Sequence, residues 1–198
     1  MEKCLIGITG GIGAGKSVVS RVLRLKGFPV YDCDSRAKEL MEESAYILAS
    51  LKSRFGEECV RESGELNRAM IAERVFSCEE ERLWLNSLVH AEVRRDISEW
   101  TAMFQEGPVF VESAIMVTSG LDRMCDRIML VEAPETLRVN RALQRGGTSL
   151  DNIVKRISAQ KEEFASLPAD KTFSIDNGGS DSLLFQIEKF LENLESVS

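Results

Sequence analysis

Residues 10–17 of the chain read GGIGAGKS. It fits the pattern G-x-x-x-x-G-K-[S/T], which is typical of a phosphate-binding loop. The apolar run KCLIGIT at residues 3–9 predicts a strand before it, and residues 18–26 follow with the spacing of a helix. The motif requires this order of strand, glycine-rich loop and helix. Because a chance match in a chain of this length has a probability on the order of one percent, we expect residues 10–17 to bind phosphate.

The residue types of this loop suit a nucleotide with a metal ion. Gly13 and Gly15 let backbone N–H groups turn toward an anion without a clash from a Cβ atom. The helix that begins here adds its unpaired N–H groups and the positive end of its dipole. Lys16 can reach the outer phosphates, and the hydroxyl of Ser17 is a natural ligand for Mg²⁺.

Length, charge and cysteine content narrow the class of protein. The 198 residues suffice for one sizeable core with a small inserted subdomain, and the net charge of −7 argues against a general nucleic-acid binder. The five cysteines form no C-x-x-C pair and no Cys/His cluster, so zinc is not expected, and their scatter favours a reducing compartment. Neither a signal peptide nor a run of transmembrane length is evident, so we expect a soluble cytoplasmic protein without a membrane or obligate protein partner.

Apolar runs and turn signals predict the remaining elements. Four more strands are expected at residues 28–31, 109–111, 127–131 and 172–175, and helices at residues 35–41, 67–76, 134–145, 150–160 and 183–194. A further helical piece is expected to end with residues 51–55, before Gly56. Asn67 is expected to cap one helix, and Ser77 with Glu80 to form a capping box that opens a long helix reaching Phe104.

Strands that alternate with helices predict an α/β fold, with a P-loop NTPase-type five-stranded parallel sheet flanked by helices. Ligands of such sheets bind beyond the carboxyl ends of the strands. Residues 1–56 and 106–198 are expected to form this core. Residues 57–105 contain helices but no expected strand, and they are interpreted as a helical insertion between the second and third strands.

Two carboxylates follow the second expected strand, at the edge of the sheet that carries the phosphate loop. Phosphoryl transfer to a hydroxyl needs a carboxylate that orients the hydroxyl and accepts its proton, and Asp32 and Asp34 could divide this work with metal binding. Either residue could instead cap the following helix, and the two roles are compatible. Glu112 ends the third expected strand, where P-loop proteins often keep an acid that faces Mg²⁺.

Arg138, Arg141 and Arg145 fall on one helical face just before Gly146-Gly147, a candidate hinge. On a closing flap, guanidinium groups would neutralise charge on a transferring phosphoryl group. The alternative is a solvated basic face, which the neighbouring phosphate loop makes the weaker interpretation. His90, the single histidine, is interpreted from the residues alone as a packed or capping side chain on the long helix.

Over nearly its whole length the chain resembles the dephospho-CoA kinase family. The stretches that carry the resemblance are IGITGGIGAGKS (6–17), FPVYDCDSRAKEL (28–40), LNRAMIAERVF (66–76), LNSLVH (85–90), SGLDRMCDRIMLVEAP (119–134), RALQRGGTSLDNIVKRISAQ (141–160) and IDNGG (175–179). The phosphate loop alone indicates only the superfamily, whereas the D-x-D position and the arginine-glutamine segment make the match close.

The resemblance implies a kinase with a core, a substrate-binding helical domain at residues 57–105 and a lid at about residues 141–160. Its reaction is the last step of coenzyme A synthesis: ATP, with Mg²⁺, phosphorylates the ribose 3′-hydroxyl of dephospho-CoA and leaves ADP. The catalytic residues that it implies are Asp34 as the base, Lys16, Arg141 and Arg145. Those implied for ATP are Gly13, Ala14, Gly15, Lys16, Ser17, Val18, Arg156 and Gln160. Those implied for dephospho-CoA are Thr9, Asp32, Asp34, Arg68 and His90, and those for the metal are Ser17, with Asp32 or Glu112 through water.

The chain departs from the family pattern at three places. The usual D-A-D is D-C-D here, with both acids kept, and the usual H-P is His90-Ala91. The common P-L-L-F-E segment before S-G-L is replaced by residues 114–118, AIMVT, which lack both the proline and the acid. Glu112 is a candidate to compensate for that acid.

Two other functions remain open from the residues. The phosphate loop does not discriminate between acceptors, so the substrate could be a nucleoside or a sugar. A nucleotide-binding switch or regulatory module is the other alternative, although a GTPase would need an N-K-x-D motif and none is present. Dependence of ATP turnover on an acceptor would separate the two.

Overall fold

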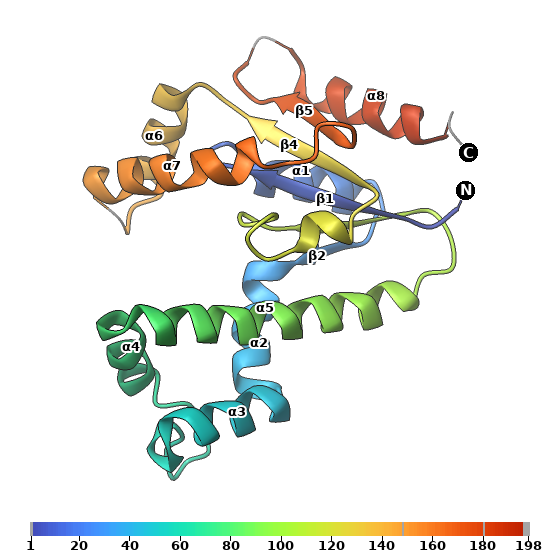
Figure 1. Cartoon of the computed structure of the whole chain (residues 1–198). Coiled ribbons are helices and arrows are strands. Elements are labelled where there is room, and N and C mark those ends of the chain that lie inside the picture. Colours follow the sequence, from blue (N-terminus) through green and yellow to red (C-terminus); the bar gives the residue numbers. More distant parts are fainter. Residues whose placement is uncertain (1, 148, 180, 196–198) are drawn as a thin grey trace. The chain divides into compact units, whose positions relative to one another are not determined.

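The computed structural model describes residues 2–147, 149–179 and 181–195 (Figure 1). The chain divides into two compact units, with boundaries between Asp32 and Cys33 and between Trp100 and Thr101. The first unit holds both ends of the described chain, and the second is the segment between the two boundaries.

The first unit is built on a parallel sheet. Among the described residues it has five strands, β1 (Cys4–Gly10), β2 (Val30–Asp32), β3 (Pro108–Glu112), β4 (Arg127–Glu132) and β5 (Thr172–Asp176), in the order β2-β3-β1-β4-β5. Every neighbouring pair is parallel. The fold class and all five strands were predicted from the sequence, and the structure confirms them.

The helices of this unit are α1 (Lys16–Leu25), α6 (Glu135–Gln144), α7 (Leu150–Ala165) and α8 (Leu183–Glu195), labelled in Figure 1. The core lies between the sheet and two of them: Ile8 and Phe110 of the sheet are fully buried in one cluster with Leu23 of α1 and Ile187 of α8. β1 lies in the middle of the sheet, between β3 and β4. A parallel strand in this position is buried on both faces, which explains why β1 is an apolar run.

The second unit is helical. It contains α2 (Cys33–Glu43), α3 (Ala45–Phe55), a short 3₁₀ turn at Glu57–Cys59, α4 (Arg68–Ser77) and most of α5 (Glu79–Ala102). Arg36 of α2 pairs with Asp96 of α5 at 3.0 Å. The rings of Phe55 and Trp84 meet edge to face, with centroids 5.4 Å apart.

Several element ends differ from the expectation. The capping box was wrong: Ser77 is the last residue of α4, and its hydroxyl donates to the carbonyls of Glu73 and Arg74 instead of capping α5. The Asn67 cap of α4 is confirmed, since its side chain accepts from Met70 N. α2 starts at Cys33, directly after β2, and α7 continues to Ala165, five residues beyond its expected end.

The second compact unit begins at Cys33, whereas the sequence placed the start of the helical insertion at residue 57. The assignment of substrate binding to the insertion, and of a lid to residues 141–160, stays a prediction. No helix among the described residues is both long and apolar enough to span a bilayer.

Candidate active site

The phosphate loop joins β1 to α1 and takes the conformation that its glycines allow. Gly13 and Gly15 have φ of 76° and 105°, a region that L side chains rarely adopt. Gly15 is the N-cap of α1 and supplies no side-chain cap. Ala14 N donates to the carbonyl of Gly11 and Val18 N to that of Gly15, which shapes the loop. The start of α1 places the positive end of the helix dipole where an anion can bind.

Lys16 is the first residue of α1, and its ammonium group folds back on the loop. Its Nζ donates to the carbonyl of Gly10 at 2.7 Å. Ser17 follows and is exposed at the start of the helix. Both side chains therefore lie at the loop, as the motif predicts.

Helix α6 packs against the same loop. Arg138 Nε donates to the carbonyl of Ile12 at 3.1 Å. Arg141 donates through Nη1 to the carbonyl of Gly13 at 3.5 Å and through Nη2 to that of Asn177 at 3.1 Å. Two of the three arginines on the predicted face thus bind loop or neighbouring backbone, whereas Arg145, at the end of α6, is exposed.

Burial sets Arg138 apart from the other two arginines. Its Nη2 is buried and has no hydrogen-bond partner among the described residues. Desolvation lowers the pKa of this guanidinium from its ordinary value. The group nevertheless keeps its charge, because an arginine is not deprotonated in proteins. The result is a fixed positive charge beside the phosphate loop.

Helix α7 completes the surroundings of the loop. The side-chain oxygen of Gln160 accepts from Ile12 N at 3.0 Å. Ile153 and Ile157 of α7 are buried together with Ala142 of α6, and Ile12 of the loop packs against them. Gln160 therefore contacts the phosphate loop, while Arg156 is exposed on α7. Binding of ATP by these two residues stays a prediction.

Asn177 follows β5 and is a contact that the sequence did not single out. Its Nδ2 donates to the carbonyl of Ala14 at 2.7 Å, and its backbone N donates to that of Glu132 at 2.7 Å. Because it also accepts from Arg141, this residue ties β4, α6 and the loop together. Its place in IDNGG directly after a predicted strand was the available signal.

Oxygen atoms gather at the carboxyl edge of the sheet. Asp32 ends β2 and Glu112 ends β3, and the two are direct partners in the register of these strands. Glu112 is also the partner of Ile8 in β1, one residue before Thr9. Thr9 is fully buried, and its hydroxyl has no hydrogen-bond partner among the described residues. Mg²⁺ prefers hard oxygen donors. The hydroxyl of Ser17 and the carboxylates of Asp32 and Glu112 are donors of this kind, so these three residues fit that ion by their chemistry.

The other predicted substrate residues belong to the second unit. Asp34 is exposed in the first turn of α2, and His90 is half-buried on α5. Arg68 starts α4 and forms an ion pair with Glu42.

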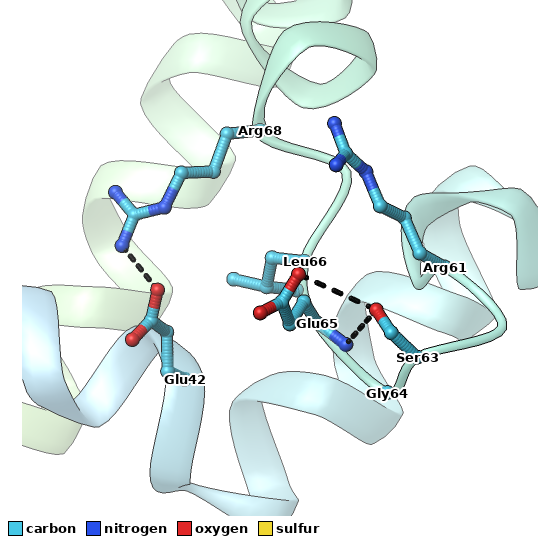
Figure 2. A pocket seen from close by; sticks show the side chains of 7 residues that line it. All are labelled: Glu42, Arg61, Ser63, Gly64, Glu65, Leu66 and Arg68. Atoms are coloured by element: carbon cyan, nitrogen blue, oxygen red, sulfur yellow. Dashed lines mark hydrogen bonds and ion pairs between the residues drawn. The ribbon is translucent and has the colours of Figure 1, made fainter.

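Arg68 lines a cavity of about 530 Å³ within the second unit. Figure 2 shows Arg68 reaching toward Glu42 on one side of the cavity, with Arg61 and Ser63 on the other and Leu66 between them. The carboxylates of Glu42 and Glu65 also line this cavity, so its two guanidinium groups are balanced by two acids, and the Ser63 hydroxyl donates to Glu65.

Comparison with known proteins identifies relatives along almost the whole chain. A family model described as dephospho-CoA kinase matches residues 4–181. The dephospho-CoA kinase of Porphyromonas gingivalis is 36% identical over 191 residues, which are 96% of this chain and 94% of the relative. A crystal structure from Thermus thermophilus is 33% identical and has a TM-score of 0.77, covering 99% of this chain and 98% of that one. Dephospho-CoA kinase from Campylobacter jejuni, 22% identical over 98% of each chain with a TM-score of 0.68, shares the fold.

Proposed function

The chain belongs to the dephospho-CoA kinase family, and from this premise we propose how its residues transfer a phosphate from ATP to the ribose 3′-hydroxyl of dephospho-CoA. The observation that carries the proposal is the phosphate loop at the end of the central strand, surrounded by cationic side chains of α6. ATP is the phosphate donor of this family.

The segment from Gly13 to Val18 holds the phosphates of ATP through its backbone and the start of α1, and the bonds of Ala14 N and Val18 N to loop carbonyls keep its shape. The Lys16 ammonium, which donates to the carbonyl of Gly10, is within the loop and neutralises the outer phosphates. Asn177 and Gln160 keep the loop in this shape by binding its backbone at Ala14 and Ile12.

A magnesium ion held at this edge would supply positive charge that offsets the charge developing on the outer phosphates. Ser17 is the direct ligand in this proposal, and Asp32 or Glu112 binds through water. The register pair of Asp32 with Glu112 at the ends of adjacent strands supports it.

Asp34 is the base in this proposal. It lies two residues beyond the end of β2, in the first turn of α2. A carboxylate here orients the 3′-hydroxyl and accepts its proton as the oxygen attacks the γ-phosphorus. Thr9, Asp32, Arg68 and His90 are the residues that we assign to binding of the acceptor, with Arg68 offering its charge to the phosphates of dephospho-CoA.

Arg141, Arg145 and Arg156 stabilise the transferred group when the segment at about residues 141–160 closes over it. The contact of Arg141 with the carbonyl of Gly13 supports a place beside the phosphates. The exposed side chains of Arg145 and Arg156 are able to move toward a bound nucleotide. Closure also excludes water and limits wasteful hydrolysis.

We also retain the proposal of a cytoplasmic location. All five cysteines are free thiols in the structure, as a reducing compartment allows.

One experiment tests the function directly. ADP formation is measured with ATP and Mg²⁺ in the presence and absence of dephospho-CoA, and with a nucleoside and a sugar as other acceptors. We expect turnover with dephospho-CoA and little with the rest. Equal ADP formation without any acceptor would contradict the proposal and favour a nucleotide-binding module.

The variant Asp34→Asn tests the base. It should fold and bind ATP, since Asp34 is exposed and Asn keeps its shape, but phosphate transfer should fall about 10²- to 10⁴-fold. The matched control is Glu43→Gln, an exposed carboxylate at the other end of α2. Undiminished transfer in Asp34→Asn would exclude Asp34 as the base.

A further inference from the structure

A buried carboxylate on α7 has no part in the mechanism above. Glu163 is 8% exposed, and no lysine or arginine of the described residues pairs with it. Its partners are instead donors of the loop after β3: Val117 N, Thr118 N at 3.1 Å and the Thr118 hydroxyl. Burial of an unpaired carboxylate is costly unless hydrogen bonds compensate, so these three bonds determine where this part of α7 lies.

The loop that Glu163 binds is itself held firmly. Met116 is fully buried, and its side chain lies against Gly7 of β1. The hydroxyl of Ser119 donates to the carbonyl of Ile115, and Leu121 N donates to that of Met116. Glu163 thus binds α7 to a loop that is anchored on the central strand.

On the same helix, Gln160 lies three residues before Glu163 and therefore on the same face. Its side-chain oxygen accepts from Ile12 N of the phosphate loop at 3.0 Å. One face of α7 therefore carries two polar contacts to the rest of the unit, one to the loop after β3 and one to the phosphate loop, beside the apolar contact of Ile153 and Ile157 with Ile12. A shift of α7 at Glu163 would move Gln160 away from Ile12.

We propose that Glu163 is a positioning residue of the nucleotide site: by fixing α7 on the loop at Val117 and Thr118, it holds Gln160 against the backbone of the phosphate loop. The inference rests on the proposed nucleotide site but not on the identity of the acceptor. Thr118 is also the position where the family pattern has its P-L-L-F-E acid, so in this chain a carboxylate reaches that position from α7.

The test measures the affinity for ADP by titration calorimetry in single and double variants. Glu163→Ala should raise the dissociation constant about tenfold, because it removes three hydrogen bonds to a buried charged acceptor. Gln160→Ala should have a similar effect. The double variant should bind ADP no less tightly than the single variant with the lower affinity, because Glu163 acts through Gln160.

Three further measurements separate positioning from a general loss of structure. Glu163→Gln keeps one oxygen that can accept from Val117 N and, at the longer distance of 3.4 Å, from Thr118 N, and it should restore part of the affinity. Steady-state kinetics of Glu163→Ala should show a higher KM for ATP and an unchanged KM for dephospho-CoA. Glu162→Ala, an exposed neighbour on α7, is the matched control and should bind ADP as the unmodified protein does.

Two outcomes would overturn the inference. One is a lower thermal stability of Glu163→Ala with unchanged ADP affinity, which would make the contact purely structural. The other is an additive loss in the double variant, which would mean that Glu163 does not act through Gln160. Failure of the proposed acceptor would appear separately, as ADP binding without dephospho-CoA-dependent turnover.

Discussion

A methyl group at Gly15 would fall on the amide nitrogen of Asn177. The same residue has φ of 105° at the point where α1 begins. Gly15→Ala therefore adds both a clash and backbone strain at the phosphate loop, and strain of this kind costs about 1–3 kcal/mol. We expect ADP binding to weaken at least about tenfold, because the loop can no longer keep its N–H groups in place.

Gly27 offers the matched control for this variant. It also has positive φ, 90°, but a Cβ atom there would meet nothing within 4 Å. Gly27→Ala should lower the melting temperature through strain alone and leave ADP affinity unchanged. Calorimetric titration and thermal unfolding of both variants separate the two effects, and full affinity in Gly15→Ala would refute the role of this glycine.

The Cys125 thiol makes stability depend on alkaline pH. Burial raises its pKa from the ordinary value to about 12. Because the pKa in the folded state exceeds that of the unfolded state, the stabilisation is complete below about pH 9 and is lost as the pH rises toward 12. The loss can reach roughly 1.4 kcal/mol per pH unit.

We therefore expect Cys125→Ala to lose less stability than the unmodified protein between about pH 8 and pH 10.5. Urea unfolding gives the free energy of unfolding of each protein at both pH values. The cavity left by the substitution lowers both values for Cys125→Ala alike, so it does not affect the change with pH. Cys78→Ala, which changes an exposed thiol, should keep the original pH dependence. Equal pH slopes for Cys125→Ala and the unmodified protein would contradict the expectation.

At the scale of the elements, Glu92 holds two helices of the second unit together. This residue of α5 is 3% exposed, accepts from the hydroxyl of Ser44 and pairs with Arg95 at 2.6 Å. Ser44 is the N-cap of α3, since its side chain accepts from Ile47 N. The cap of one helix is therefore fixed by a buried acid of another.

Glu92→Ala should lower the free energy of unfolding by about 2–3 kcal/mol, because it leaves a buried hydroxyl without its acceptor and α3 with a weaker cap. Glu99→Ala is the control: Glu99 contacts the same Arg95 at 3.9 Å but is exposed. The free energy of unfolding of Glu99→Ala should fall by less than about 0.5 kcal/mol. Denaturant unfolding measures both, and equal losses would show that burial at Glu92 adds nothing.

The strands were predictable because each is a short apolar run between turn residues, as buried parallel strands require. The ends of the helices were harder to predict from the sequence. Ser77 and Glu80 have the spacing of a capping box, but α4 continues through Ser77, whose hydroxyl finds acceptors in its own last turn. A local pattern cannot show which of two adjacent helices a serine belongs to.

The candidate site also has one part that was predictable from the sequence and one part that was not. The phosphate loop was predictable, because its binding groups are consecutive in the sequence. The contacts of Asn177 and Glu163 with residues more than 40 positions away could not be predicted, because they depend on how distant parts of the chain pack. The roles assigned to Asp34, Arg68 and the lid arginines remain predictions.

At the scale of the whole molecule, the boundary between the two units falls between the residues of D-C-D. Asp32 ends β2 in the sheet unit, and Asp34 lies in α2 of the helical unit. The proposed metal ligand and the proposed base are therefore parts of different units although one residue separates them. Binding of ATP should accordingly affect the sheet unit, whereas binding of the acceptor should affect the helical unit in addition to Thr9 and Asp32 of the sheet unit.

Hydrogen exchange followed by mass spectrometry tests this division. ADP with Mg²⁺ should slow exchange at residues 10–25 and 138–160, since the loop, α6 and α7 share contacts around Ile12. Dephospho-CoA alone should slow exchange at residues 57–77, which include Arg61 and Arg68 of the cavity. The segment 183–195 of α8 lies outside both predicted sites and serves as the internal reference. Protection of residues 57–77 by ADP alone, with none from dephospho-CoA, would refute the assignment of acceptor binding to the helical unit.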